Sequence, residues 1–177
     1  MKIVKWIGIT LLVLAVLFVI IGVSLPDRGA VKRSVVIKAP VAVVFENVNN
    51  LRNHEKWDPW QASDKTMKIT YGPVTAGTGA SYSWASRNSG AGTQTITESV
   101  PDSLIKTEFV FADMGGAATG WFRFAVVNGD VRVTEGFTSA PHRCFCGRYL
   151  DLLTYPEVGK QFVKGLNRLK ELSETGK

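Results

Sequence analysis

Six consecutive segments between residues 67 and 139 alternate apolar with polar side chains, and this pattern constrains the fold more than any other feature of the chain. The segments read MKITY, ASYSW, TQTITESV, SLIKTEFVFAD, GWFRFAVV and DVRVTEGFTS, with Gly, Pro, Asn or Asp residues between them. A period of two is typical of a β-strand that buries one face. Asn128-Gly129-Asp130, between the last two segments, predicts a hairpin turn. Because the links are short, the six segments predict an antiparallel sheet.

Strand and helix patterns flank these six segments. Residues 31–40 mix β-branched and charged side chains as a strand does, and residues 41–51 then place apolar side chains at helical spacing after a proline. From Pro156 onward, apolar residues recur every three or four positions, which predicts one long amphipathic helix: Val158, Phe162, Leu166, Leu169 and Leu172. The predicted fold class is therefore α+β, with a curved antiparallel sheet of about seven strands wrapped on a long C-terminal helix. Such a sheet curls faster than one helix can fill, which leaves room between them.

The N-terminus carries a second strong signal, an uncharged stretch of 19 residues from Ile7 to Leu25. At about 1.5 Å per residue, this stretch just crosses a hydrocarbon core of about 30 Å. Fourteen of its residues are Leu, Ile, Val or Phe, which favour insertion by about 4 to 8 kcal/mol before the small polar residues are counted. We therefore predict a transmembrane anchor and linker over residues 1–27, followed by one domain over residues 28–177. Gly22-Val23-Ser24 is a poor cleavage site, so an uncleaved anchor is favoured over a signal peptide.

The charge distribution argues against one class of partner but does not decide on which side of the membrane the domain lies. Lys2 and Lys5 precede the apolar stretch and four basic residues follow it between Arg28 and Lys38, so the positive-inside count does not decide. A short cationic head before a long apolar run favours an inside N-terminus, with the domain outside a single-pass cell-membrane anchor. The formal net charge of +6 is spread thinly, which argues against a nucleic-acid interface.

The alternating strands place aromatic side chains on one face. Ile105, Thr107, Phe109 and Phe111 share a face of one strand, while Lys106 and Glu108 point the other way. Each ring taken alone could be ordinary core, but together the rings exceed what one covering helix needs. We therefore predict that the following residues line a cavity and contact a ligand: Trp57, Trp60, Tyr82, Trp84, Phe109, Phe111, Phe122, Phe124, Glu135, Phe137 and Phe162.

Glu135 breaks the apolar pattern of its strand. Strict alternation places its carboxyl among Val131, Val133 and Phe137, where an unpaired charge costs several kcal/mol. Three interpretations stay open at this point: a polar contact to a ligand, a buried pair with an arginine such as Arg123 or Arg143, or an exposed bulge at Gly136.

The stretch NHEKWDPW, residues 53–60, resembles a reactive site in composition only. Catalysis by His54 needs a nucleophile or carboxylate within hydrogen-bond reach, and catalysis by Asp58 or Glu55 needs burial that shifts the pKa, neither of which the sequence supplies. His54 with Asp58 gives too few ligands for a metal. The favoured interpretation is that Asp58-Pro59 ends a short helix and that Trp57 and Trp60 fold over one mouth of the cavity.

Other motifs give no catalytic, metal or cofactor assignment. His142, Cys144 and Cys146 would point to one side of an extended segment and could hold zinc, although their tight spacing strains a chelate and cysteine is often a small buried hydrophobe. The glycine turns AGTGA and SGAGT lack the lysine and helix of a phosphate loop, and no G-x-S-x-G elbow occurs.

Several stretches together carry a family resemblance: IKAP, VAVVFENVNNL, HEKWDPW, GPVTAGTGASYSW, TITESVPDSLIKTEF and FVKGLNRLKEL. Over residues 31–174 the chain resembles the SRPBCC superfamily, and more narrowly its polyketide cyclase/dehydrase and lipid transport branch, related to START and Bet v 1 domains. The WDPW turn and the Gly77-Thr78-Gly79 turn are the most specific parts. The resemblance implies a helix-grip fold with a hydrophobic cavity between sheet and long helix. It favours a large apolar residue at position 135, so Glu135 is a departure.

Within that family some members cyclise or hydrolyse, and many only bind or carry apolar ligands, so the fold alone does not give the function. We expect a membrane-anchored domain that binds a hydrophobic or amphipathic small molecule, such as a lipid, a polyketide-like compound or an isoprenoid, without cofactor and without chemistry. One alternative is a cyclase, dehydratase or hydrolase that uses Glu135 or His54 as acid or base. Another is a structural or envelope-stress partner domain with a filled core and no ligand.

Overall fold

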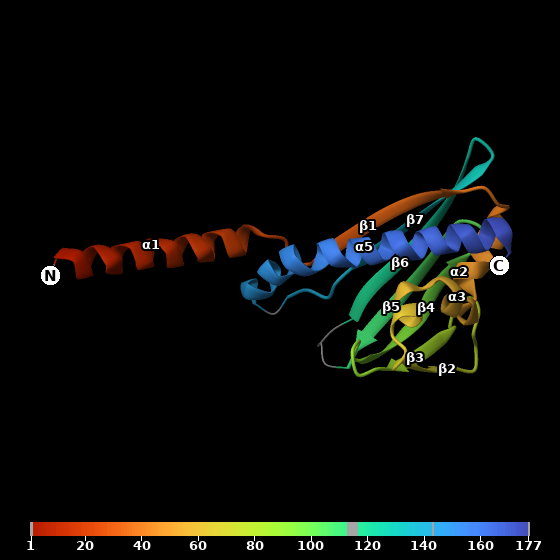
Figure 1. Cartoon of the computed structure of the whole chain (residues 1–177), viewed down its shortest axis with the longest axis horizontal. Helices are drawn as coiled ribbons and strands as arrows, with labels where there is room; N and C mark the ends of the chain where they lie inside the picture. Colours follow the sequence, from red (N-terminus) through yellow and green to blue (C-terminus); the bar gives the residue numbers. More distant parts are fainter. Residues whose placement is uncertain (1, 113–116, 143, 177) are drawn as a thin grey trace.

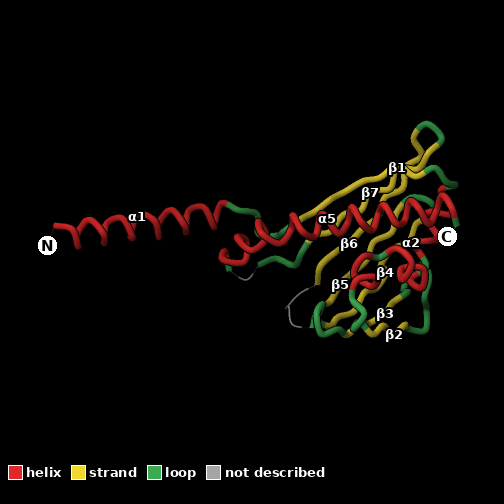
Figure 2. The backbone as a smooth tube through the Cα atoms, viewed as in Figure 1, coloured by secondary structure: helices red, strands yellow, loops and turns green. Residues whose placement is uncertain are grey.

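The computed structural model describes residues 2–112, 117–142 and 144–176, and it contains one antiparallel sheet. The strand order is β1-β7-β6-β5-β4-β3-β2. The strands are β1 (Ala30–Ile37), β2 (Lys68–Tyr71), β3 (Ser81–Ala85), β4 (Ala91–Val100), β5 (Leu104–Phe111), β6 (Ala117–Val127) and β7 (Asp130–Thr138). Each of the strands β2 to β7 pairs with its neighbour in sequence, and β1 closes the order by pairing with β7 (Figure 2). The predicted α+β helix-grip fold is confirmed.

Helices cover one face of this sheet. The long helix α5 (Phe145–Thr175) runs diagonally across it, and α2 (Val41–Asn49), the 3-10 turn η1 (Leu51–Asn53), α3 (His54–Trp57) and α4 (Pro59–Ser63) lie beside its C-terminal half (Figure 1). Between these layers sits a core of fully buried side chains that includes Ile37, Val44, Leu51, Ile96 and Leu169. The predicted hairpin turn occurs at Asn128-Gly129, where both residues have positive φ values of 54° and 87°.

Helix α5 begins eleven residues earlier than the sequence predicts. Proline is favoured in the first turn of a helix, so Pro156 was the expected start, but it lies inside α5. The additional turns contact residues far away in sequence, among them Phe18 of α1 and Phe137 of β7, so helical periodicity alone does not reveal them. Cys146 therefore lies in a helix, and the extended arrangement of His142, Cys144 and Cys146 that could have held zinc does not form.

Helix α1 (Lys2–Ser24) projects away from the sheet and ends beside the start of α5 (Figure 1). Its segment Ile3–Ser24 is long and apolar enough to cross a membrane, a property that it shares with signal sequences. Its side chains are largely exposed, including Trp6, Leu14 and Ile20. Open apolar grooves on α1, lined by residues such as Ile7 and Val16, belong to this helix surface and are not lined by the sheet.

Candidate functional site

Residues 54–63, which comprise α3, Asp58 and α4, form a lid over one part of the sheet. The Trp57 indole N–H donates to the Asn47 carbonyl at 2.9 Å, and its ring meets Phe122 edge-on at 5.9 Å. Trp60 meets Phe162 of α5 edge-on at 5.8 Å. The two tryptophans therefore join the lid to the sheet and to the long helix respectively.

His54 has a structural position in this lid. Its side chain is 3% exposed, and its Nε2 lies 2.8 Å from the Val48 carbonyl oxygen, so this nitrogen donates its proton in the neutral ring. Burial lowers the pKa of His54 to about 4, and the bond to Val48 opposes this fall. The imidazole is thus neutral at physiological pH and has its donor occupied.

Asp58 links the two lid helices and faces the interior. Its Oδ1 accepts the backbone N–H groups of Trp60 at 2.8 Å and Gln61 at 3.3 Å, which caps α4. Burial raises the pKa of the Asp58 carboxyl to about 6, while the two N–H groups and the charge of Arg168 oppose the rise. This carboxyl consequently titrates close to neutral pH.

Glu135 lies on the inner face of β7, opposite Phe122 of β6, and is 8% exposed. Burial, and then the negative charge of Asp58, raises its pKa well above the usual value. The exposed bulge at Gly136 does not form, and neither does the pair with Arg123. The pairing of β7 continues through Gly136 without a bulge, and Arg123 lies on the outer face above the Trp121 ring. Arg143, the other proposed partner, lies outside the described residues.

Further polar groups lie in the same interior, and sequence reasoning did not identify Gln61 and Gln94 among them. The Tyr82 hydroxyl donates to Gln94 Oε1 at 2.6 Å, and burial, followed by the Asp58 charge, raises its pKa. The Gln61 amide is close enough to Tyr82 to oppose that rise, although no hydrogen bond of ordinary geometry joins them. We call Asp58, Gln61, Tyr82, Gln94, Thr107 and Glu135 the interior polar cluster.

Three members of the interior polar cluster keep buried polar atoms without a hydrogen-bond partner among the described residues. These atoms are both amide atoms of Gln61, Oγ1 of Thr107 and Oε2 of Glu135. Thr107 of β5 pairs with Gly120 of β6. Two residues further along β6, Phe122 pairs with Glu135 of β7. A β-carbon at Gly120 would lie 2.6 Å from Thr107 Oγ1, so no larger side chain separates these groups at this position.

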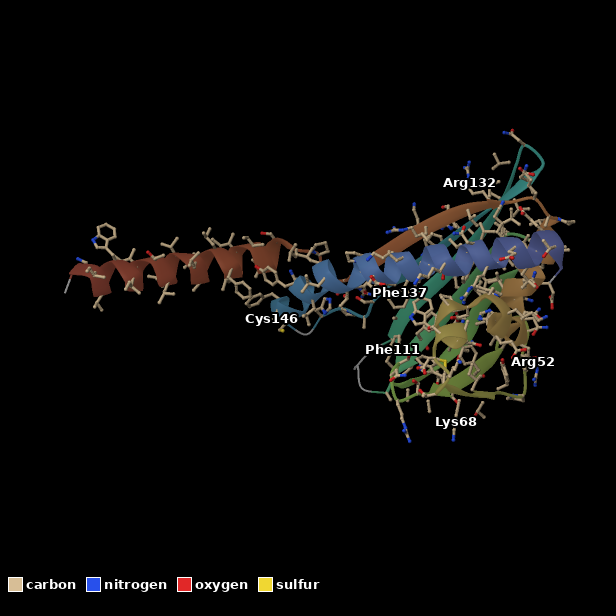
Figure 3. The ribbon with its side chains drawn as sticks, viewed as in Figure 1. Arg52, Lys68, Phe111, Arg132, Phe137 and Cys146 are labelled. Atoms are coloured by element: carbon tan, nitrogen blue, oxygen red, sulfur yellow. The ribbon has the colours of Figure 1, made fainter. Side chains whose placement is uncertain are left out.

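The predicted ring residues separate into two sets. Tyr82, Phe122, Phe124, Trp57 and Phe162 are buried in the core, whereas Trp60, Trp84, Phe109, Phe111 and Phe137 are only half-buried. Ring contacts connect Trp84 to Phe111, Phe111 to Phe109, Phe109 to Phe137 and Phe137 to Tyr155, with centroids 5.5 to 6.5 Å apart. We call these five residues the aromatic wall. Phe111 and Phe137 mark it at the end of the sheet nearest α1 (Figure 3).

The second candidate motif forms no metal site in the part of the chain that the structure describes. His142 Nε2 lies 2.7 Å from Asp151 Oδ2, and Cys144 and Cys146 are free and exposed. Within those residues no group of three or more His, Cys, Asp and Glu side chains could hold a metal ion.

Comparison with known proteins agrees with this architecture. A family model described as polyketide cyclase / dehydrase and lipid transport matches residues 28–174. No curated protein matches the chain. A Staphylococcus aureus protein of unknown function superposes with a TM-score of 0.65 at 14% identity, over 85% of this chain and 96% of that one.

Two further solved structures are similar. A protein from Chromobacterium violaceum has a TM-score of 0.57 at 18% identity, over 82% of this chain and 97% of that one. A protein in the dynemicin biosynthetic locus has a TM-score of 0.59 at 19% identity, over 86% of this chain and 49% of that one. At these identities the similarity shows the fold alone.

Proposed function

Because the chain belongs to the polyketide cyclase/dehydrase and lipid transport family, we propose that its domain binds one hydrophobic or amphipathic small molecule between the sheet and α5. A lipid, a polyketide-like compound or an isoprenoid has the required chemistry. The observation that carries this proposal is the set of unpartnered buried polar atoms of Gln61, Thr107 and Glu135 beside the aromatic wall.

Unpartnered polar atoms are costly in a folded protein. Each buried donor or acceptor without a partner costs about 1 to 3 kcal/mol, and a structural core has no need for three such residues on facing elements. A ligand that carries a hydroxyl or protonated carboxyl group can both donate and accept, and so could supply partners to donors and acceptors of this set. Gln61 and Thr107 can each donate and accept, and the Glu135 carboxyl accepts in either form and donates when protonated, so the site suits a polar group of either kind.

The aromatic wall suits the apolar part of the same ligand. Phe109, Phe111 and Phe137 are half-buried, so their faces are available to a hydrocarbon chain or ring system at the sheet end nearest α1. The ligand would therefore lie with its polar group under the lid and its apolar body toward α1.

Helix α1 serves in this proposal as a retained membrane anchor. Arg148 of α5 donates to the carbonyls of Val23 and Leu25 at 2.9 and 2.7 Å, and Tyr149 stacks on Phe18. Cleavage after Ser24 would remove the contacts with Val23 and Phe18, which supports retention. An anchored site meets apolar ligands at a high local concentration in the bilayer.

The test uses the full chain purified under native conditions in lipid nanodiscs, followed by solvent extraction and mass spectrometry of bound molecules. Thr107→Val removes one unpartnered hydroxyl at constant shape, so we expect greater stability together with loss of the co-purifying compound. Thr119→Val, at an exposed position on the outer face of β6, is the matched control and should change neither. A stabilised Thr107→Val protein that retains the same compound at the same stoichiometry would overturn the proposed polar contact.

A second function, acid catalysis in the same interior, is favoured by one observation. Asp58 has a pKa of about 6, and burial together with the Asp58 charge raises the pKa of Glu135 well above its usual value, which is a suitable arrangement for a general acid. The extracted compound distinguishes the two functions. Conversion of that compound by the wild type and its unchanged retention by Glu135→Gln would indicate an enzyme, whereas unchanged retention by both proteins indicates a binding domain.

A further inference from the structure

The first turns of α5 project beyond the sheet and are fastened to the last two turns of α1. The Tyr149 ring stacks on Phe18 at 4.6 Å with an interplanar angle of 6°, and the Tyr149 hydroxyl donates to the Phe18 carbonyl. Phe145 meets Phe18 edge-on at 5.9 Å. A β-carbon at Gly22 would lie 2.5 Å from the Phe145 ring, so glycine permits this close approach.

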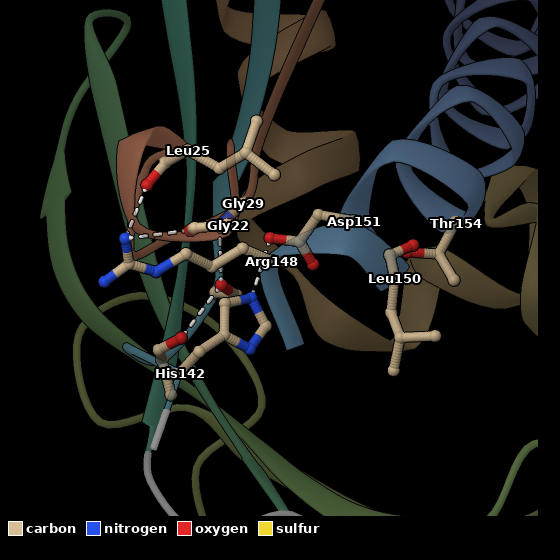
Figure 4. A network of polar contacts seen from close by, with 10 residues as sticks. Gly22, Leu25, Gly29, His142, Arg148, Leu150, Asp151 and Thr154 are labelled. Atoms are coloured by element: carbon tan, nitrogen blue, oxygen red, sulfur yellow. Dashed lines mark hydrogen bonds and ion pairs between the residues drawn. The ribbon is translucent and has the colours of Figure 1, made fainter. Parts of the chain in front are cut away.

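Charged groups in this segment are turned to protein partners. Arg148 Nη1 donates to the carbonyls of Gly22, Val23 and Leu25, which are left free at the end of α1, and its charge complements that helix terminus (Figure 4). Asp151 lies 2.7 Å from His142 in the same network. Arg148 and Asp151 are the charged residues between Cys144 and Tyr155, and each has a protein partner outside that segment, although Arg148 Nε is buried without a hydrogen-bond partner among the described residues.

Large apolar side chains occupy the rest of the segment and face outward. Leu150, Leu152 and Leu153 are 61%, 58% and 77% exposed. An exposed group of large apolar side chains of this kind marks an interaction site.

The position of α1 indicates what the three exposed leucines contact. If Ile3–Ser24 crosses the bilayer, its 22 residues extend about 33 Å, close to the thickness of the hydrocarbon core. Phe18 then lies six residues, or about 9 Å, inside the end of the helix. Because Tyr149 and Phe145 contact Phe18, the start of α5 must lie at the same depth.

We propose that residues 145–153 of α5 insert beside α1 into the same leaflet, with the three leucines in lipid, and hold the aromatic wall against the membrane surface. This inference rests on the proposed anchoring by α1. It adds a second membrane contact and a fixed orientation, in which a ligand passes between the bilayer and the half-buried rings of Phe111 and Phe137 without crossing water.

Spin labels on the full chain in phosphatidylcholine/phosphatidylglycerol nanodiscs test this depth. The native Cys146 is free and exposed, so a nitroxide placed there in a Cys144→Ser chain reports on the start of α5. Arg132→Cys, in a chain with both native cysteines replaced, is the water reference, because Arg132 lies at the opposite end of the domain (Figure 3). Leu14→Cys in the same background is the bilayer reference on α1.

We expect the label at Cys146 to collide more with oxygen and less with a water-soluble nickel chelate than the label at Arg132→Cys does. Its accessibility to the two reagents should therefore be closer to that of the label at Leu14→Cys. Leu153→Asp should shift the Cys146 label back toward the water reference and leave Leu14→Cys unchanged. A water-exposed Cys146 label together with a buried Leu14→Cys label would overturn this inference alone. A water-exposed Leu14→Cys label would overturn the anchor as well. Dipolar broadening at a water-exposed Cys146 label would indicate a second copy of the chain as the occupant.

Discussion

Asp58→Asn should change the pH dependence of stability in a direction that follows from burial. The pKa of Asp58 rises from 3.8 to about 6 in the folded protein. Between these two pH values the Asp58 carboxyl is more protonated in the folded protein than in the unfolded one. The contribution of Asp58 to the free energy of unfolding is therefore fully present below about pH 4 and is lost as the pH rises through about 6. A shift of about two units corresponds to up to about 3 kcal/mol.

Asparagine keeps the shape of the side chain and one oxygen that can accept the backbone N–H groups of Trp60 and Gln61. We therefore expect Asp58→Asn to match the wild type near pH 4 and to exceed it by up to about 3 kcal/mol at about pH 7. Urea unfolding of the full chain in detergent micelles, followed by tryptophan fluorescence, measures this difference, since Trp57 and Trp60 lie in the lid.

Asp64→Asn provides a matched control of opposite sign. The Asp64 carboxylate accepts hydrogen bonds from Thr66, Ser86 and Ser89, and these hold its pKa below the usual range. Its contribution to stability is present above the unfolded pKa and lost as the pH falls, so Asp64→Asn should be the less stable variant at neutral pH. An Asp58→Asn difference from the wild type that stays constant across this pH range would refute the assignment of Asp58 as a buried, raised acid.

Three further predictions concern the lid and the inner face of the sheet. The wild type should lose up to about 3 kcal/mol of folding stability as the pH falls from 6.5 toward about 4, because the buried His54 then gains a proton more readily in the unfolded chain. His54→Gln can still donate to Val48 and should not show this loss. Urea unfolding that finds the same acid sensitivity in both proteins would contradict this prediction. Glu135→Leu should gain stability over the wild type increasingly above pH 4.5 and lose the co-purifying compound; calorimetry that finds a pH-independent difference would disprove a raised acid. Trp57→Phe should lower the folding stability by about 2 to 4 kcal/mol and Trp60→Phe by less, because Trp57 is 3% exposed and hydrogen-bonded to Asn47 whereas Trp60 is half-buried. Equal urea midpoints for the two variants would contradict this difference.

Alternation and turn chemistry predicted the sheet closely, because each strand must present one apolar face to the helices. The same alternation placed Glu135 on the inner face, as observed. Of the two arginines considered as partners, Arg123 lies on the outer face, as alternation along its own strand indicates.

Other parts of the site could not be found by patterns along the chain. Thr107 and Gln61 are ordinary polar residues in sequence, and their meaning comes from being buried without partners, which only the packed layers determine. The early start of α5 was missed for a related reason. Its first turns depend on Phe18 and Gly22 of α1, more than a hundred residues away, and proline at position 156 gave a competing local signal.

The sheet order also sets the sequence in which the nascent chain can fold. Strands β2 to β7 pair with their neighbours and can form as successive hairpins, but β1 is synthesised first and pairs with β7, where Ala30 meets Thr138. At about 5 to 20 residues per second, β1 must wait roughly 5 to 20 s for its partner. An unpaired strand is prone to aggregate during such a delay, and charges on it reduce that tendency. Lys32 and Arg33 place two exposed charges on this strand, which should reduce the aggregation of the ribosome-bound chain before β7 is synthesised.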